Sequence, residues 1–198
     1  GSLLVVLSTP KHTPYGGGLL KVAPDSTVLW EVPRHIHHHV ITTPDGTILA
    51  LDQEVAWKEP VLGSAGRLGH LSDGILMLAS DGTVLDRLSL VEAFANSPFA
   101  AALRVEGSDL NGDPLHANSL HRFGETAAAF PFASPDDLLV SVRNPSLLAV
   151  VSLAERRVKA VFSGAWHRQH EAVPPADGTI RLFDNGGDFR GDGYGSRV

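Results

Sequence analysis

Four short polar segments interrupt the otherwise apolar sequence, and they carry the side chains best suited to chemistry. The segments are His35–Val40, Asp113–Ser119, Ser141–Ser146 and Trp166–Ala172. They supply imidazole, guanidinium and carboxylate groups, which transfer protons, attack electrophilic centres or bind anions. Imidazole changes its charge close to physiological pH, and the chain has 10 histidines in 198 residues. The polar segments therefore predict a site assembled from distant parts of the chain.

Two of these segments occupy the same place in a recurring turn-and-strand unit. His38 lies seven residues before Asp45-Gly46, and His170 lies seven residues before Asp177-Gly178. Where such units are arranged around an axis, as in a β-propeller, equivalent positions converge on the central channel. We therefore expect three imidazoles and one guanidinium from consecutive units to meet at the channel mouth: His38, His116, Arg143 and His170.

The histidine run has a second possible use, as a metal site. Alternate side chains of a strand share a face, which places His35, His37 and His39 on one side and the residues between them on the other. Three imidazoles could bind zinc. Metal ligands normally come from several elements, however, and the sequence offers no obvious partner, so we predict no metal site. A metal-dependent enzyme stays open as an alternative that the metal content would decide.

The elements that must position these residues are predicted to be strands. Short stretches rich in valine, isoleucine and leucine recur, and no stretch keeps a helical period. The predicted strands are Leu3–Leu7, Gly18–Val22, Thr27–Val32, Thr47–Leu51, Gly74–Leu78, Thr83–Leu88, Leu138–Val142, Leu147–Leu153, Val158–Phe162 and Thr179–Phe183. Turns such as Pro44-Asp45-Gly46 and Ser72-Asp73-Gly74 precede many of them. One short helix is predicted over Leu90–Ala95, with Ser89 as its N-cap.

The spacing of turns and strands favours four-stranded units of roughly 40–50 residues, the blades of a β-propeller. A chain of 198 residues would form about four such blades. We therefore expect one all-β domain over residues 1–198, as a propeller or as part of a larger one with about six blades. A β-sandwich is the alternative fold. The segment Phe94–Pro114 departs from the pattern and is predicted to be a long loop across one face.

Composition narrows the possible functions. The chain has 16 Lys+Arg against 22 Asp+Glu, and a net charge of −6 disfavours binding to a nucleic-acid backbone. It has no cysteine, which excludes disulfides, thiolate catalysis and cysteine-ligated metals. Its apolar runs are far shorter than the roughly 20 residues of a membrane-spanning helix. Gly16-Gly17-Gly18 lacks P-loop spacing, so no nucleotide cofactor is predicted, and no signal peptide is visible.

Taken in order, the motifs resemble those of the bacterial arylsulfotransferase family, β-propeller enzymes that use phenolic sulfate esters as donors. That family has runs of the type His-His-Asp-Val, Pro-Asp-Gly-Asn-Ile-Leu, His-Ala-Asn-Ser, Ser-Ser-Arg-Asn, Gln-His-Asp and Phe-Asp-Asn-Gly. The counterparts here are His37–Val40, Pro44–Leu49, His116–Ser119, Ser141–Asn144, Gln169–Glu171 and Phe183–Gly186. Each motif alone is weak, whereas their shared order from about Leu20 to the C-terminus is specific.

The resemblance implies an activity and a role for each polar residue. It implies transfer of a sulfuryl group from a phenolic sulfate to a phenol, without a cofactor, through a sulfated histidine that corresponds to His170. The family's other catalytic positions correspond to His38, His116 and Arg143. We also expect Asn118 and His37 to bind substrate. The family's aspartates are replaced by His39 and Glu171, and we expect these neighbours to point away from the channel and to act in support.

The implied chemistry suits these residue types. The transferred SO3 group spreads charge over three oxygens, much as a phosphoryl group does. The fork of Arg143 can hold two of these oxygens, while His38 and His116 can donate to the third or exchange protons with phenols. The partners would be a phenolic sulfate donor and a phenol acceptor, and the resemblance implies a periplasmic or secreted enzyme. The alternative is a non-catalytic propeller that binds a small anion or a partner at the channel mouth.

Overall fold

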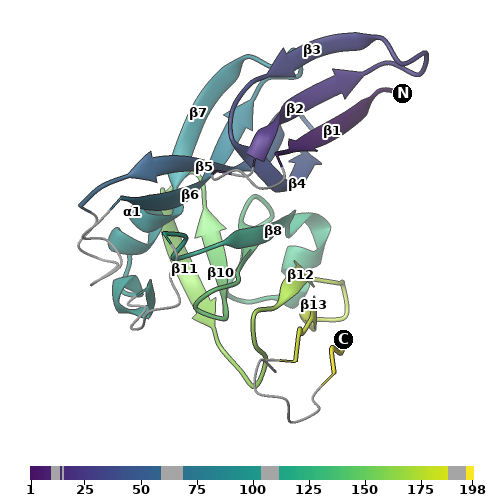
Figure 1. Ribbon diagram of the computed structural model, residues 1–198. Helices are drawn as coiled ribbons and strands as arrows, with labels where there is room; N and C mark the ends of the chain where they lie inside the picture. The colour runs from purple at the N-terminus through teal and green to yellow at the C-terminus, as the bar shows by residue number, and fades with distance from the viewer. Residues whose placement is uncertain (10–13, 15, 59–68, 104–111, 187–194) are drawn as a thin grey trace.

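The computed structural model describes residues 1–9, 14, 16–58, 69–103, 112–186 and 195–198. This part of the chain is all-β, with four antiparallel sheets of which none closes on itself (Figure 1). In space the strand orders are β1-β2-β3, β4-β5-β6-β7, β11-β10-β9-β8 and β12-β13. The strands are β1 Leu3–Ser8, β2 Gly16–Val22, β3 Val28–Val32, β4 Ile36–Thr42, β5 Ile48–Ala56, β6 His70–Leu78, β7 Val84–Ser89, β8 Ala117–Arg122, β9 Leu138–Val142, β10 Leu147–Ser152, β11 Arg157–Phe162, β12 His170–Val173 and β13 Arg181–Phe183.

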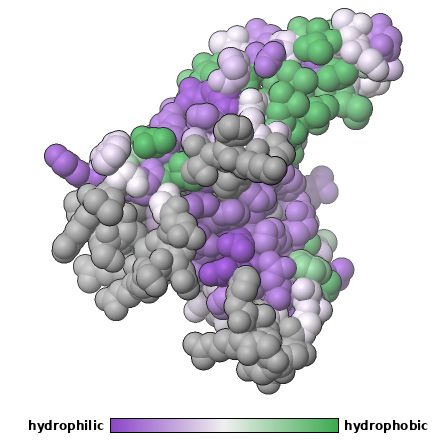
Figure 2. Space-filling model, viewed as in Figure 1, coloured by the Kyte–Doolittle hydropathy of each residue, from purple (hydrophilic) through white to green (hydrophobic). Residues whose placement is uncertain are grey.

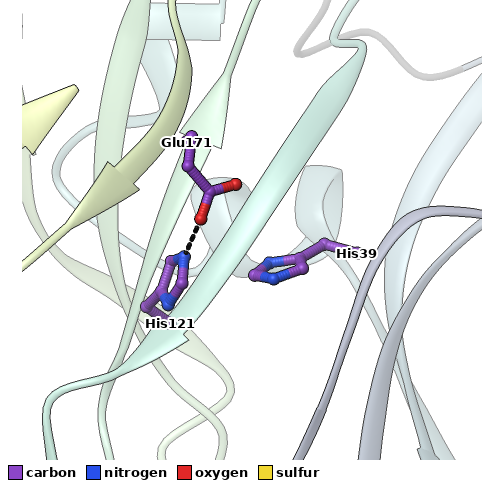
Figure 3. Close-up of side chains that lie close together, drawn as sticks. All are labelled: His39, His121 and Glu171. Carbon is purple, nitrogen blue, oxygen red and sulfur yellow. Dashed lines mark hydrogen bonds and ion pairs between the residues drawn. The ribbon is translucent and has the colours of Figure 1, made fainter. Parts of the chain in front are cut away.

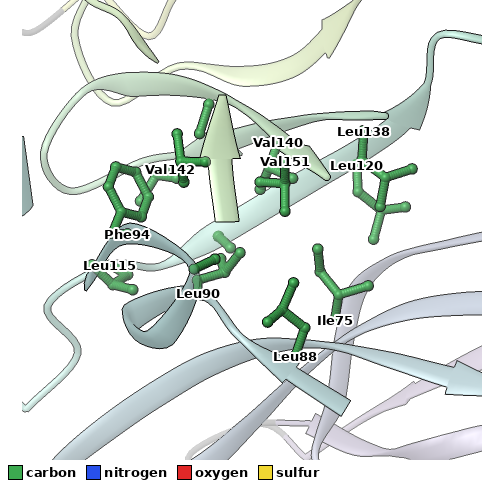
Figure 4. Close-up of a cluster of buried hydrophobic side chains, with 14 of the residues drawn as sticks. Ile75, Leu88, Leu90, Phe94, Leu115, Leu120, Leu138, Val140, Val142 and Val151 are labelled. Carbon is green, nitrogen blue, oxygen red and sulfur yellow. The ribbon is translucent and has the colours of Figure 1, made fainter. Parts of the chain in front are cut away.

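Consecutive sheets share a hydrophobic core. Between the second and third sheets, Ile75 and Leu88 meet Leu120 and Val140, and the short helix α1 (Leu90–Ala95) adds Phe94 (Figure 4). A second cluster joins the first two sheets through residues that include Leu19, Val32, Ile36, Ile48 and Leu76. A third joins the last two through residues that include Phe123, Phe130, Leu139, Val150 and Ala172. Each sheet is thus held by burial of apolar surface against its neighbour in the sequence.

The first strand of each sheet contacts the first strand of the next. β1 contacts β4, β4 contacts β8, and β8 contacts β12. Three of the polar segments lie on or beside these strands, because β4, β8 and β12 begin at residues 36, 117 and 170. The sheet order therefore brings together segments that are far apart in the sequence.

The hairpin turns repeat one hydrogen-bonding pattern. In four turns an aspartate accepts from the backbone N–H of a threonine two residues later, at 2.9–3.2 Å. The pairs are Asp25–Thr27, Asp45–Thr47, Asp81–Thr83 and Asp177–Thr179. The residue between them has a positive φ, between 70° and 88°, which explains why glycine fills it in three of the four. The turns predicted at Asp45-Gly46 and Asp177-Gly178 are confirmed.

The predicted helix is also confirmed, whereas one predicted turn is wrong. α1 spans Leu90–Ala95, and the Ser89 hydroxyl accepts from the Glu92 N–H. Ser72-Asp73-Gly74 forms no turn, because it lies in the middle of β6. Gly74 serves close packing there: a Cβ at this position would lie 2.6 Å from the Arg87 side chain.

One further prediction concerns the connection between the second and third sheets. The segment predicted as a long loop, Phe94–Pro114, contains the end of α1 and a 3-10 turn, η3, over Ala100–Leu103, and residues 104–111 lie outside the described part. A second such turn, η5, spans Gly124–Ala129. Within the described residues no helix is long and apolar enough to cross a membrane.

Polar and apolar side chains are segregated on the surface. In the view of Figure 2, hydrophobic side chains gather over the sheet of β1–β3, while hydrophilic ones cover the region of β8 and β12. The exposed residues of the apolar region include Leu3, Val28 and Leu29, each more than half exposed. The polar region is where the histidine-rich strands meet.

Candidate active site

Three histidine rings from three different sheets lie beside one another. The ring centroid of His38, on β4, is 5.1 Å from that of His116 and 6.3 Å from that of His170, at the start of β12. His116 directly precedes β8. The backbone N–H of Arg143, at the end of β9, donates to the His116 carbonyl at 3.2 Å. The structure therefore brings the four residues together. The prediction that each lies on a unit of its own is wrong for two of them, because His116 precedes β8 and Arg143 follows β9 in the same sheet.

The histidines lie where their strands are irregular. The register with the next strand shifts within residues 36–40, 117–119 and 170–173. Left-handed backbone angles occur beside these shifts, at His38 (φ 51°), His116 (φ 53°) and Glu171 (φ 48°). Such angles are uncommon outside glycine and collect at functional sites, and a β-bulge turns a side chain to a new direction. The irregular backbone thus aims these side chains.

The bulge overturns the predicted alternation along the histidine run. The prediction that His35, His37 and His39 share a face is wrong, because the backbone at His38 leaves the extended conformation. His37 is buried with 2% of its surface exposed, whereas His35 is exposed and the ring of His39 packs against His121 at 4.7 Å. The alternative of a zinc site built from His35, His37 and His39 loses its geometric basis.

A buried chain of polar groups directs the proton of the His38 ring. Asp73 Oδ1 lies 3.2 Å from His37 Nε2, and His37 Nδ1 lies 2.8 Å from His38 Nδ1. The contact of Asp73 Oδ1 with His37 Nε2 lacks hydrogen-bond geometry, but the carboxylate favours a proton rather than a lone pair on the nitrogen that faces it. A neutral His37 therefore carries its proton on Nε2 and accepts at Nδ1. His38 then donates from Nδ1 and keeps a lone pair on Nε2.

His116 is paired with a carboxylate of its own. Its Nδ1 lies 2.5 Å from Asp113 Oδ2, and the two side chains are 20% and 16% exposed. A carboxylate only accepts, so Nδ1 of His116 donates to Asp113. Arg143 belongs to the same network, because its Nη1 donates to Asn144 Oδ1 at 2.8 Å while Asn144 Nδ2 donates to the Asp113 carbonyl.

The His170 ring is held by backbone. Its Nδ1 lies 3.1 Å from the Arg168 carbonyl oxygen and 3.0 Å from Asn185 Nδ2, which also donates to that carbonyl at 2.7 Å. We assign the proton of the neutral ring to Nδ1, which donates to the carbonyl, and the lone pair to Nε2. Arg168 has a left-handed φ of 51°, so the carbonyl is presented by an unusual backbone conformation.

The surroundings keep two of the rings neutral. Burial lowers the pKa of His170; the hydrogen bond to the Arg168 carbonyl opposes this shift, and the charge of Arg143 adds to it. Partial burial also lowers the pKa of His38 to about 3, and the adjacent His37 and His116 rings add to the effect. Near pH 7 both His38 and His170 are therefore neutral imidazoles with a lone pair on Nε2, the form that attacks an electrophile or takes a proton.

The comparison with known families agrees with this arrangement. One family model, described as Arylsulfotransferase (ASST), matches residues 12–196. The chain belongs to the arylsulfotransferase family. The resemblance predicted from the motifs is confirmed, and membership supports an arylsulfotransferase-like function on small-molecule substrates at the level of the family. A comparison with curated proteins found no match.

In this member of the family, the glutamine of the Gln-His motif anchors the strand that carries His170. Gln169 is fully buried, and its Nε2 donates to the carbonyls of Leu147 and Val142 at 2.9 and 3.2 Å. Asn118 Nδ2 donates in turn to the Gln169 carbonyl at 2.8 Å. These bonds tie β12 to the sheet of β8–β11.

The two predicted substrate-binding residues are both buried. Asn118 is 5% exposed and His37 is 2% exposed, and the contacts described above join each of them to neighbouring protein groups. Their contact with substrate stays a prediction. In the structure, Asn118 joins β8 to the residue before His170, and His37 lies between Asp73 and His38.

The residues that replace the family's aspartates form a second cluster. His39, His121 and Glu171 come from β4, β8 and β12, and His121 Nε2 lies 2.7 Å from Glu171 Oε1 (Figure 3). One ligand atom from each lies within 4.8 Å of the others, a set typical of divalent transition metals. However, the Leu120 N–H donates to His39 Nδ1 at 3.0 Å, so a neutral His39 carries its proton on Nε2. As folded, the cluster is a junction that joins three strands, and a metal would have to displace that bond.

Three residues of the site were not predicted from the sequence. Asp113 lies three residues before His116 in a polar segment, and Asn185 lies in the Phe-Asp-Asn-Gly motif, so a signal for both was present. Asp73 was not predicted, because the glycine that follows it favours a turn on the surface. Only the pairing of β6 with β5 places this carboxylate inside the protein, where it is fully buried.

Proposed function

We propose that this chain transfers a sulfuryl group from a phenolic sulfate ester to a phenol, with His170 as the residue that carries the group between them. The observation that carries the proposal is the meeting of His38, His116 and His170 from three sheets, with Nδ1 of His170 held as a donor by a carbonyl. An imidazole held in this way has its lone pair on Nε2 and can attack sulfur. Membership in the arylsulfotransferase family supports the same reaction class.

In the first half of the reaction, Nε2 of His170 attacks the sulfur of the donor. The new N–S bond forms as the bond between sulfur and the phenolic oxygen breaks, and the phenolate leaves. Protonated His116 gives its Nε2 proton to the leaving oxygen, while Asp113 stabilises the protonated ring before transfer. The sulfated His170 keeps its Nδ1 proton on the Arg168 carbonyl. Arg143 carries a fixed positive charge beside these rings, suited to the sulfuryl oxygens.

In the second half, an acceptor phenol attacks the same sulfur on the side opposite the S–N bond, where the first phenolate left. Its proton passes to Nε2 of His38, the S–N bond breaks, and His170 returns to the neutral ring with the lone pair on Nε2. The proton on His38 then returns to solvent or to His116, which restores the starting state. Donor and acceptor bind in turn, so the kinetics are of the ping-pong type.

We also infer that the four sheets are successive blades of a β-propeller. Support comes from the contacts of β1 with β4, β4 with β8 and β8 with β12, which are those expected of the innermost strands around an axis. The cores shared by consecutive sheets are of the kind that stacks blades side by side. A propeller explains why equivalent positions of different units meet at one site.

The test is a sulfate-transfer assay with a chromogenic aryl sulfate and a phenol acceptor. Wild-type protein should release phenol, form the acceptor sulfate and give an acid-labile SO3 adduct on the peptide that contains His170. The variant H170N should do none of these. H167N is the matched control, because His167 is exposed and lies only three residues away. Binding of the aryl sulfate without turnover would instead support the alternative of an anion-binding propeller.

A further inference from the structure

Asp73 is a buried carboxylate that the proposed reaction does not use. It lies in β6, with 0% of its surface exposed, between the paired strands β5 and β7. Transfer of an ionised carboxylate into a protein interior is unfavourable unless partners compensate for the lost water. Its position in mid-strand therefore calls for a reason beyond packing.

The partners of Asp73 lead to two histidines of the site. Oδ1 lies 3.2 Å from Nε2 of His37, the residue before His38. Oδ2 accepts from the backbone N–H of Ala117 at 3.1 Å, the residue after His116. One carboxylate on β6 thus touches the chain neighbours of two active-site rings, on β4 and at the start of β8.

The first of these contacts sets the direction of a proton chain. His37 Nδ1 lies 2.8 Å from His38 Nδ1, so one ring must donate and the other accept. The Asp73 carboxylate 3.2 Å away favours the proton of a neutral His37 on Nε2. His37 then accepts from His38 at Nδ1, and His38 keeps its lone pair on Nε2. If the chain ran the other way, His38 would present a proton there and could not take one from a phenol.

We propose that Asp73 and His37 are positioning residues that fix the tautomer of His38, and thereby make it the base for the acceptor phenol. The inference rests on the proposed function for its catalytic part. The Asp73 charge also raises the pKa of His38, against the stronger lowering by burial and by the neighbouring imidazoles. When His38 takes the phenol proton, the buried carboxylate stabilises the charge across His37.

The variant D73N tests the direction of the chain, because one oxygen of residue 73 is already committed. The Ala117 N–H needs an acceptor, so the single oxygen of the asparagine stays on that side. Its NH2 group then faces His37 Nε2 and donates to it. His37 consequently donates to His38, and the proton of His38 moves to Nε2. The change reverses the chain while it keeps the size and shape of the side chain.

The experiment combines nitrogen NMR of the histidine rings with ping-pong kinetics. In wild-type protein Nδ1 of His38 should carry the proton, and in D73N Nε2 should. The value of kcat/KM for the acceptor should fall about 100-fold, the usual contribution of a general base, while that for the donor changes less than about threefold. D52N is the matched control, because Asp52 is equally buried but pairs with Arg87 on β7 at 2.8 Å. It should change neither the tautomer nor the ratio of the two constants.

A second variant keeps the test decisive if D73N does not fold. H37Q retains a donor toward Asp73 and removes the acceptor facing His38, so the tautomer preference and the acceptor constant should again be lost. An unchanged His38 tautomer, or equal losses for donor and acceptor, would overturn the inference. A reversed tautomer in a protein without wild-type transferase activity would uphold the proton chain and overturn the proposed function.

Discussion

Replacing Asp113 with asparagine tests whether His116 is the acid for the departing phenol. Asp113 Oδ2 lies 2.5 Å from His116 Nδ1, and both side chains are mostly buried. A hydrogen bond to a charged group contributes about 1.5–3 kcal/mol, and asparagine removes the charge while keeping the shape. If the protonated His116 ring loses about 2 kcal/mol of stabilisation, the step in which it protonates the leaving phenolate should slow roughly 30-fold. The conversion uses about 1.36 kcal/mol for each factor of ten in rate.

The assay compares donors whose leaving phenols differ in acidity. A nitrophenolate departs without help, so D113N should hydrolyse or transfer from nitrophenyl sulfate at close to the wild-type rate. With an alkylphenyl sulfate, whose phenolate needs a proton, the roughly 30-fold loss should appear in full. D136N is the control, because Asp136 is 89% exposed and pairs with Arg122 on the surface. A loss of the same size for every donor would refute the role of His116 as an acid.

Two further predictions concern the fold. Truncation of Phe94, fully buried in the core between the second and third sheets, should lower the free energy of unfolding by about 3–5 kcal/mol in urea titrations of F94A; a loss below about 1 kcal/mol would contradict the packing described. Hydrogen bonds from Thr43 and Thr47 lower the pKa of Asp45, and those from Thr83 lower that of Asp81, below the ordinary value of 3.8. Their stabilising effect is therefore present above pH 3.8 and is lost as the pH falls through the lowered values. The double variant D45N/D81N should melt below wild type at pH 7, and the difference should shrink in acid; a difference independent of pH would count against these bonds.

The strands could be predicted because their signal is local. Each predicted stretch overlaps a strand, since valine, isoleucine and leucine between turn residues favour a pleated, buried surface. β8 and β12 were not predicted, because Ala117–Arg122 and His170–Val173 are rich in polar residues. Their stability comes from contacts with other strands, such as the hydrogen bonds of Gln169. The strand propensity of single residues does not reflect such contacts.

The meeting of the three histidines with Arg143 could be predicted, but the direction of their side chains and their polar partners could not. The order of His38, His116, Arg143 and His170 along the chain follows from the repeat, and a repeat brings equivalent positions together. Strict alternation failed at His38, because a bulge adds a residue to one strand without changing the composition of the run. A left-handed backbone angle at a histidine costs about 1–3 kcal/mol. It persists only where bonds from the surrounding structure hold it, and those bonds are not visible in the local sequence.

The two departures from the family's motifs meet in space, and each one explains the other. His39 and Glu171 follow His38 and His170, at positions where the motifs that the chain resembles have aspartate. Aspartate at both positions would bring two negative charges to the same side of His121, and like charges repel. Here one carboxylate remains: Glu171 reaches His121 Nε2 at 2.7 Å, while His39 accepts from the Leu120 N–H. The exchange of one acid for an imidazole thus removes the repulsion, and Glu171 joins β12 to β8 through His121.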